Sequence, residues 1–306
     1  MPSLLNWAII SLSLINTILL LWLGLTVKLN AERRSWGVSL ISGGLLLGGL
    51  FFVSHTAILG YGLTSLDQSI NFWWQLGLVA ALILPFVWYI VILWYSGFWE
   101  DRQSTLYRRH LAAFALDVFI TFTSLVLLLF ANPFPSFSQV IALQLSQTLS
   151  VAGVPAIVIV YMISTLLSIM LSVDVLMRPG PVRRIMGDIA RQRAKPWLVA
   201  TSLMLLLVGL LIAGVMIWIV IRGNRLVELG EVSPMETGVA WFDMVTSGSI
   251  TLAVLFLGQA IVRYEVFTGK TLPQRRFMRH WRNVVALAIS CGVVMSAALL
   301  GSVHPV

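Results

Sequence analysis

Asp117, Thr121 and Ser124 recur at i, i+4 and i+7 within an otherwise apolar stretch of the chain. This spacing places the three polar side chains on one face of a helix. A carboxyl group in hydrocarbon costs roughly 2.5–3.5 kcal/mol, so it normally faces a helix-bundle interior or water. The stripe is typical of a proton or ion relay, or of a switch between helices. A carboxyl group that only joins two helices by hydrogen bonds is the simpler alternative. Asp174 and Arg178 predict an interfacial ion pair, because they lie four residues apart.

A second group of polar residues lies in four other apolar stretches. If neighbouring stretches run antiparallel, these residues lie at similar depths in the membrane. Aromatic residues lie just beyond them, towards the ends of the same stretches. Half-buried polar groups beneath an aromatic rim are typical of a small-molecule pocket, although any large helix bundle brings some polar groups together. The sequence therefore predicts a candidate ligand site at Asn16, His55, Trp73, Trp74, Gln75, Asp243 and Thr246.

The motifs of common enzymes are missing from the sequence. It contains no His-Glu-x-x-His pair for zinc, no Gly-x-Ser-x-Gly turn and no phosphate-binding Gly-x-x-x-x-Gly-Lys loop. The single cysteine, Cys291, excludes an internal disulfide and a multi-cysteine metal site. His110 and His280 fall in basic connections, which leaves His55 and His304 as a weak pair of axial ligands for haem. No enzymatic activity, metal or cofactor is therefore expected.

Eight long apolar stretches surround these polar residues. Charged residues make up 10% of the 306-residue chain, against about 25% in soluble domains, and apolar residues make up 58%. Each stretch is long enough to span a bilayer, since about 20 helical residues cross a hydrocarbon core of roughly 30 Å. Most of the 12 Trp residues lie near stretch ends, where indole rings favour the headgroup level. We predict one all-α, polytopic integral membrane bundle over residues 1–306, with transmembrane helices at 4–28, 36–59, 72–96, 111–132, 152–177, 197–221, 240–263 and 283–303.

Lys and Arg residues occupy every second gap between the predicted spans. Of the 20 Lys and Arg residues, only Arg222 and Arg225 lie elsewhere. Short connections rich in Lys and Arg remain on the cytoplasmic side, so we predict that the N- and C-termini are both extracytoplasmic. The net charge of +8 thus indicates membrane topology and not nucleic-acid binding. The expected location is the inner (plasma) membrane, as a multi-pass protein with lipids as partners and a homodimer as an open alternative.

Four connections have features of their own. Segment 178–196 predicts a short amphipathic helix on the inner leaflet, and segment 264–282 predicts a turn-rich basic loop. Segment 133–150 is uncharged and predicts a helix on the outer leaflet, whereas the acidic segment 222–239 predicts a solvated loop. The basic connections mark topology and contact lipid headgroups, or they dock a cytoplasmic partner. On the second interpretation the coupling residues are Arg183, Arg184, Arg191, Arg275 and Arg276.

Residues 72–99, FWWQLGLVAALILPFVWYIVILWYSGFW, combine an aromatic start, a central Leu-Pro, a Trp and a closing Tyr-x-Gly. Together with the Ala-Glu-Arg-Arg connection and the glycine-rich second span, the region of about residues 5–100 resembles the N-terminal seven-transmembrane region of bacterial sensor histidine kinases. The segment YEVFTGKTLP resembles sequence from GAF-containing bacterial sensors. The resemblance implies an extracytoplasmic N-terminus and a role as the input module of a signalling protein. The matching residues are Trp73, Trp74, Leu84, Pro85, Trp88, Tyr95 and Gly97.

Three functions fit these patterns. The first is a membrane-embedded sensor of an unknown small ligand, which relays a cue to a cytoplasmic signalling domain or protein. Sensor histidine kinases continue into a cytoplasmic output domain, whereas this chain has an eighth span, so the output is expected in a separate partner or in a missing domain. The second is a transporter or channel-like protein that uses Asp117 and the outer polar residues. The third is a structural subunit that binds lipid or pigment.

Overall fold

A computed structural model of the chain describes residues 2–30, 36–61, 68–131, 150–151, 154–180, 188–228, 233–264 and 274–303. The predicted number of transmembrane helices is confirmed, because eight of the described helices are long and apolar enough to cross a membrane. These are α1 Pro2–Asn30, α2 Trp36–Tyr61, α3 Gln68–Tyr95, α4 Thr105–Val126 with its π-helical extension η1 Leu127–Ala131, α6 Ala156–Met177, α7 Asp188–Glu228, α8 Ser233–Tyr264 and α9 Gln274–Val303. Within the described residues, strand structure is limited to a short antiparallel pair, β1 Ser150–Val151 with β2 Val154–Pro155.

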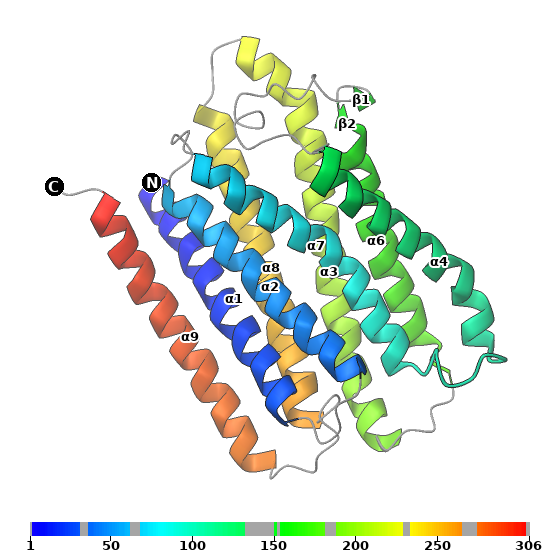
Figure 1. Ribbon diagram of the computed structural model, residues 1–306. Coiled ribbons are helices and arrows are strands. Elements are labelled where there is room, and N and C mark those ends of the chain that lie inside the picture. Colours follow the sequence, from blue (N-terminus) through cyan, green and yellow to red (C-terminus); the bar gives the residue numbers. More distant parts are fainter. Residues whose placement is uncertain are drawn as a thin grey trace.

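Six of the helices close into a ring. α1 packs on α2, α2 on α3, α3 on α6, α6 on α7, α7 on α8, and α8 returns to α1. α4 lies outside this ring against α3 and α6, and α9 lies outside it against α1 and α8 (Figure 1). Because the helices alternate in direction, α1 starts and α9 ends at the same end of the bundle, which we call the terminal end. The opposite end carries Lys28, Arg102, Arg109 and Arg178, and we call it the basic end.

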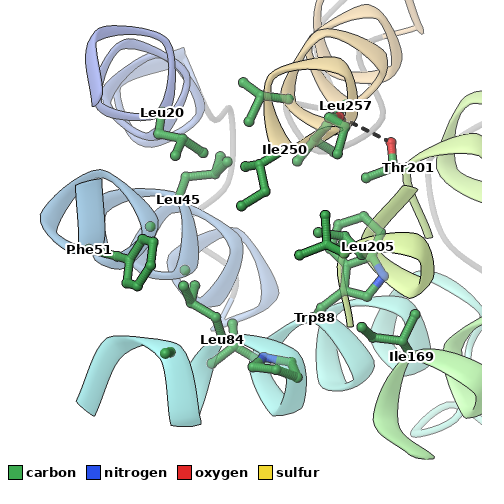
Figure 2. Close-up of a pocket in the computed structure, with 18 of the residues that line it drawn as sticks. Leu20, Leu45, Phe51, Leu84, Trp88, Ile169, Thr201, Leu205, Ile250 and Leu257 are labelled. Atoms are coloured by element: carbon green, nitrogen blue, oxygen red, sulfur yellow. Dashed lines mark hydrogen bonds between the residues drawn. The ribbon is translucent and has the colours of Figure 1, made fainter. Parts of the chain in front are cut away.

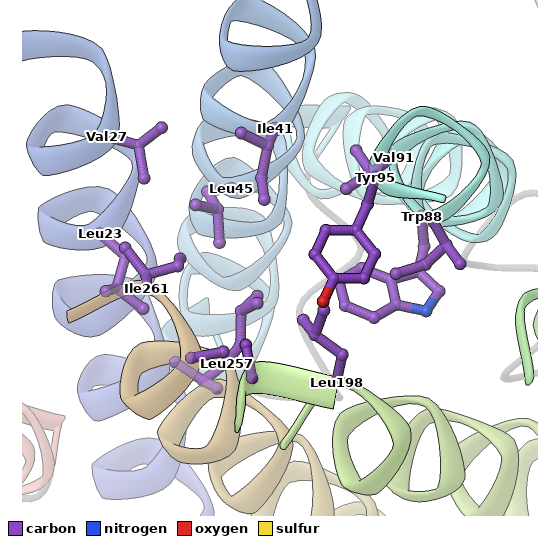
Figure 3. Packing of buried hydrophobic residues seen from close by; sticks show 14 of the residues in the cluster. Leu23, Val27, Ile41, Leu45, Trp88, Val91, Tyr95, Leu198, Leu257 and Ile261 are labelled. Carbon is purple, nitrogen blue, oxygen red and sulfur yellow. The ribbon is translucent and has the colours of Figure 1, made fainter. Parts of the chain in front are cut away.

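Buried aliphatic and aromatic side chains fill the part of the ring towards the basic end. Figure 3 shows Leu23, Ile41, Tyr95 and Leu198 converging there from four different helices. Between transmembrane helices, close packing supplies much of the attraction, because lipid tails are as apolar as the side chains. Gly44 illustrates this closeness, because a Cβ atom there would lie 2.8 Å from a side-chain carbon of α3.

The two helices outside the ring expose large apolar side chains. On α4, Phe119 is 67% exposed and Phe122 is 66% exposed, and on α9, Leu287 is 62% exposed and Val294 is 67% exposed. Apolar faces of this extent are typical of surfaces that contact hydrocarbon and not water. Together with the eight helices of membrane length, they support a multi-pass membrane protein.

α3 ends at a glycine turn. Gly97 has φ of 83°, a conformation that side chains with a Cβ rarely adopt. The N–H groups of Gly97 and Phe98 donate to carbonyl oxygens in the last turn of α3 at 3.2 and 3.1 Å. This pair of bonds is the Schellman ending of a helix, and it directs the chain away from α3 towards α4.

α4 starts earlier than predicted. The side chain of Ser104 accepts a hydrogen bond from the backbone N–H of Tyr107 at 3.2 Å and so caps the helix. The helix therefore starts at Thr105 and not at residue 111, although basic residues occupy its first turns. His110, predicted in a connection, lies on this helix.

α6 and α9 also start elsewhere than predicted. α6 starts directly after Pro155, which restricts the residue before it to extended backbone. α9 starts at Gln274, so the turn-rich loop predicted over 264–282 is wrong in its second half. The basic residues there extend a helix whose Trp281 is only 2% exposed and stacks on Trp22 with ring centroids 5.5 Å apart. Trp281 therefore contributes to helix packing.

α7 is one continuous helix over 188–228, which corrects two predictions. The separate inner-leaflet helix predicted for 178–196 is wrong from residue 188 onwards. Pro196 lies inside α7, since a proline removes only one helix hydrogen bond and the first turns are held against α3. The solvated loop predicted for 222–239 is also largely wrong, because α8 already starts at Ser233 with a proline in its first turn.

Candidate functional site: an apolar cavity below a polar cluster

A polar cluster joins α1, α2 and α8 towards the terminal end of the bundle. The imidazole of His55 on α2 lies between two partners, with Nε2 3.1 Å from Asp243 Oδ2 on α8 and Nδ1 3.1 Å from Ser13 Oγ on α1. The side chains of His55 and Asp243 are 21% and 24% exposed. Ser13 is fully buried and also contacts Thr56 Oγ1 at 2.7 Å. One imidazole ring therefore connects three helices.

Asn16 and Ser247 extend this cluster. Asn16 Nδ2 donates to the backbone carbonyl of Ser247 at 3.1 Å, and Ser247 Oγ donates to Asp243 Oδ1 at 3.2 Å. Asn16 is 0% exposed, and its Oδ1 has no hydrogen-bond partner among the described residues. Of the predicted ligand-site residues, the structure thus brings together Asn16, His55 and Asp243.

The other predicted ligand-site residues lie apart from the cluster. Gln75 is exposed on α3. Trp73 meets α2 through its backbone carbonyl, which accepts a hydrogen bond from Ser54 Oγ. Trp74 is half-buried on α3, and Thr246 is half-buried on α8 beside the serine that contacts the cluster. Of these four residues, Gln75 therefore turns away from the imidazole.

Ser13, His55 and Asp243 have the connectivity of a hydrolase relay, in which a hydroxyl, an imidazole and a carboxylate form a chain. The surroundings do not favour catalysis. Ser13 is 0% exposed, so a substrate cannot reach its oxygen, and the hydroxyl lies 3.2 Å from the carbonyl oxygen of Phe52. Ser13 is not among the predicted site residues. It precedes Asn16 by three residues and so lies on the same helix face.

An apolar cavity of about 220 Å³ lies in the middle of the ring, and all six ring helices line it (Figure 2). The described lining contains no charged side chain, and its hydroxyl groups come from Tyr161, Thr165 and Thr201. No sequence pattern predicts this cavity. Its apolar wall includes one residue or more from each helix, for example Leu20, Leu45, Trp88, Ile169, Leu205 and Leu257.

The cavity lies one helical turn further into the bundle than the polar cluster. On α1, the cavity residue Leu20 follows Asn16 by four positions, and on α2, the cavity residue Phe51 precedes His55 by four positions. On α8, the cavity residue Ile250 follows Ser247 by three positions. Phe51 stacks on the imidazole of His55, with ring centroids 6.2 Å apart and planes at 13°. A change in the position of Phe51 therefore acts directly on the cluster.

A second polar network joins α3, α4 and α6 near the basic end. Tyr89 OH is 2.9 Å from His110 Nδ1, and His110 Nε2 is 3.1 Å from Asp174 Oδ2. Arg109 Nε lies 3.2 Å from the same carboxylate oxygen. The predicted pair of Asp174 and Arg178 is present, at 3.9 Å between Oδ1 and Nε. His110 is 1% exposed, so this residue is a buried contact between helices.

Arg191 on α7 connects three helices at the same end. Its guanidinium donates to the carbonyl oxygens of Gly180 at 3.2 Å and Ser96 at 3.4 Å, and lies 5.6 Å from the centroid of the Tyr95 ring. Tyr95 OH donates in return to the Arg191 carbonyl at 2.8 Å. Figure 3 shows the Tyr95 hydroxyl pointing towards α7 beside Leu198. Arg191, a predicted coupling residue, is thus part of the helix packing.

The remaining predicted coupling residues have no described contacts. Arg183 and Arg184 lie outside the described residues, as does the outer-leaflet helix predicted for 133–150 apart from its last residue. Arg275 and Arg276 lie in the first turn of α9, where the structure describes the helix and not these side chains.

The predicted polar stripe on α4 faces α6 and not the cavity. Asp117 is 0% exposed, and Ser168 Oγ on α6 lies 2.8 and 3.0 Å from its two carboxyl oxygens. Thr121 and Ser124 are buried on the same face, and Thr121 Oγ1 has no hydrogen-bond partner among the described residues. The stripe and the cluster around the imidazole therefore belong to different helix pairs.

The polar contacts divide the ring into two halves. The cluster at the terminal end joins α1, α2 and α8. At the basic end, Tyr95 and Arg191 join α3 to α7, and His110 of α4 links α3 to α6. The cavity lies between these halves. Apolar side chains make most of the wall there, and hydrogen bonds cross from Ser54 Oγ to the carbonyl of Trp73 and, at 3.5 Å, from Thr201 Oγ1 to the carbonyl of Ala253.

Comparisons with protein-family models, with curated proteins and with solved structures found no match for the chain. The eight helices of membrane length and the apolar outer faces define a multi-pass helical membrane protein. Within that class, this protein is distinguished by a closed six-helix ring around an apolar cavity, with polar contacts on both sides of it.

Proposed function

We propose that the protein is a membrane-embedded sensor, in which a small ligand in the central cavity changes the packing of the two half-rings. The observation that carries this proposal is the position of the cavity, which all six ring helices line and which lies between the halves. A ligand there contacts both halves, so its binding free energy depends on their relative positions. It shifts the equilibrium between two packings by as much as its affinities for them differ.

Helices that line the cavity also carry the contacts at the basic end. On α3, the cavity residue Trp88 is followed directly by Tyr89, and on α6 the cavity residue Ile169 precedes Asp174 by less than two turns. α7 connects the cavity to Arg191 in the same way. A displacement at the cavity wall therefore acts on the basic end through rigid helices.

We place the basic end in the cytoplasm, where a signalling domain or partner protein would receive the cue. The support is the distribution of Lys and Arg, and the likeness of about residues 5–100 to histidine-kinase sensor regions agrees with it. Two variants in a Cys291→Ser background test the orientation, Leu4→Cys at the terminal end and Arg102→Cys at the basic end. On intact cells, a membrane-impermeant thiol reagent should label only Leu4→Cys. Labelling of Arg102→Cys alone would invert the orientation and remove the proposed output side.

Transport is the second candidate, and Asp117 is the observation in its favour. A fully buried carboxyl group within a membrane span is typical of ion pathways. Sensing is the better supported of the two, because Asp117 lies between α4 and α6 and not among the residues that line the cavity. The described cavity wall also offers no charged side chain to an ion.

Two measurements separate these functions. If the protein is a sensor, the tagged chain purified in mild detergent should retain a cytoplasmic signalling partner, and its proteoliposomes should show no proton or sodium flux. A flux that is lost in Asp117→Asn would establish transport instead. Ser172→Ala is the matched control for that variant, because this buried serine of α6 bonds to its own helix.

A further inference from the structure

We infer that the central cavity binds a neutral, mainly apolar molecule that carries a hydroxyl group. This inference rests on the proposed sensing function and names the chemical class of its ligand. The class follows from three properties of the cavity, namely its lack of charge, the hydrogen-bonding groups of its wall and its volume.

The absence of charge in the described wall excludes an ionic ligand. An ion that enters such a cavity loses its hydration and gains no counter-charge, which is strongly unfavourable. His55 and Asp243 lie one turn away, and they already pair with each other at 3.1 Å. A neutral molecule avoids this desolvation cost, and the aliphatic wall favours an apolar body.

The wall offers hydrogen-bond acceptors to a hydroxyl group. Thr201 Oγ1 has one hydrogen, which faces the carbonyl oxygen of Trp197 at 2.9 Å and that of Ala253 at 3.5 Å, so its lone pairs remain to accept. Pro85 has no N–H, so the carbonyl of Ala81 lacks the usual helix donor, and both residues line the cavity. The indole N–H of Trp88 is already donated to Ser202 Oγ at 3.1 Å. Tyr161 and Thr165 also present hydroxyl groups, so a ligand hydroxyl, which both donates and accepts, fits this wall.

The volume sets the size of the ligand. At about 220 Å³, the cavity is larger than the apolar cavity of roughly 150 Å³ that binds benzene in an engineered protein. Gly48 lines the cavity and helps to keep this space open, because it has no side chain. A Cβ atom there would fill part of the space beside Leu20, whose nearest side-chain carbon would lie at 3.4 Å. A medium-chain alcohol such as octan-1-ol is thus a suitable probe.

Photolabelling with a diazirine derivative of octan-1-ol tests the inference directly. The full chain in lipid nanodiscs is irradiated with the probe, and the labelled residues are identified by mass spectrometry. We expect saturable labelling of cavity residues on α2, α3 and α8. Excess octan-1-ol should compete at least about 5-fold better than octane at equal membrane concentration, as expected for one hydrogen bond of about 1 kcal/mol. Octyltrimethylammonium should not compete.

Three variants make the test specific. Ala253→Phe fills the cavity from α8, where Ala253 is 2% exposed, and should reduce saturable labelling at least 10-fold. Ala115→Phe adds the same side chain on the exposed face of α4 and should leave labelling unchanged. Thr201→Val keeps the shape and removes one of the two acceptors, so octan-1-ol should lose at least about half of its advantage over octane. The thermal unfolding midpoint of each variant verifies its fold, and Thr201→Val decides the question if Ala253→Phe unfolds.

The inference is overturned if labelling does not saturate and falls only on lipid-facing residues such as Phe119 and Phe122. Equal labelling of the folded Ala253→Phe variant and the wild type would overturn it as well. Labelling reports binding alone, so its failure leaves the proposed sensing function standing when a signalling partner still co-purifies. Conversely, saturable labelling together with an ion flux lost in Asp117→Asn would remove the sensing function and leave the binding site.

Discussion

Replacing Ser168 by alanine should destabilise the protein more than replacing Ser172 by alanine, although the two serines are closely matched. Both lie on α6, both are 0% exposed, and each Oγ lies within hydrogen-bond distance of the carbonyl oxygen four residues earlier, at 2.9 and 2.8 Å. Among the described contacts, only Ser168 also reaches Asp117 on α4. The difference between the two variants therefore isolates the contribution of the contact between α4 and α6.

The size of this difference follows from the burial of the carboxyl group. Ser168→Ala removes the described hydrogen-bond partner of Asp117, which is 0% exposed. An unsatisfied buried polar group costs about 1–3 kcal/mol. Hydrogen bonds between transmembrane helices contribute about 0.6 kcal/mol on average and about 1.7 kcal/mol at most. α4 lies outside the ring and can relax, so we expect Ser168→Ala to lower the free energy of unfolding by about 1–2 kcal/mol more than Ser172→Ala.

Reversible unfolding by SDS in mixed micelles measures both free energies. The same two variants in an Asp117→Ala background are the control, and there the difference should vanish. Equal losses for Ser168→Ala and Ser172→Ala in the wild-type background, within about 0.3 kcal/mol, would refute the contact as a source of stability.

Two further contacts predict measurable effects. In a double-mutant cycle, His55→Phe and Asp243→Asn should be coupled by about 0.6–1.7 kcal/mol, and additive losses would contradict their contact at 3.1 Å. Gly258→Ala should lower the free energy of unfolding by about 1–3 kcal/mol, because a Cβ atom there would lie 2.3 Å from the ring of Trp281. Gly248→Ala on the same helix has its nearest neighbour at 4.0 Å and should be neutral or stabilising by up to about 1 kcal/mol. Thermal unfolding compares the two glycine variants, and equal effects would show that Trp281 is not packed in this way.

The number of spans could be predicted because each helix must contain enough apolar residues to cross the hydrocarbon core. The helix ends could not, because hydropathy reports where lipid lies and not where the helical backbone stops. The two arginines before His110 predict a connection at this residue. The helix nevertheless begins at Thr105, directly after the cap at Ser104. The start of α9 shows the same effect. Trp281 packs against Trp22, which is distant in the sequence, so no local pattern indicates this contact.

Part of the polar cluster could be predicted from depth alone. In antiparallel spans, residues at equal depth meet if their helices turn the right faces to one another, and Asn16, His55 and Asp243 do so. Gln75 has a similar depth but turns outwards on α3. Depth follows from counting residues, whereas the direction of a side chain depends on how the neighbouring helices pack.

The cavity could not be predicted, because the side chains that line it are of the same kinds as those that face lipid. Leu205 lines the cavity, whereas Leu207 on the same helix is 41% exposed on the outer surface. In a soluble protein the apolar face of a helix marks its interior. In a membrane both faces are apolar, so only the arrangement of the helices distinguishes the two leucines.

The placement of polar contacts has a consequence for motion. Within each half of the ring, helices are joined by hydrogen bonds, such as those of His55 at one end and Tyr95 at the other. Hydrogen bonds weaken steeply with angle and so fix one geometry, whereas apolar contacts are non-directional and tolerate a shift. Apolar side chains make most of the cavity wall between the halves, so a molecule in the cavity contacts mainly non-directional packing there. Under the sensing function proposed above, a ligand there would need to supply only the free-energy difference between two apolar packings, while each half would keep its own hydrogen bonds.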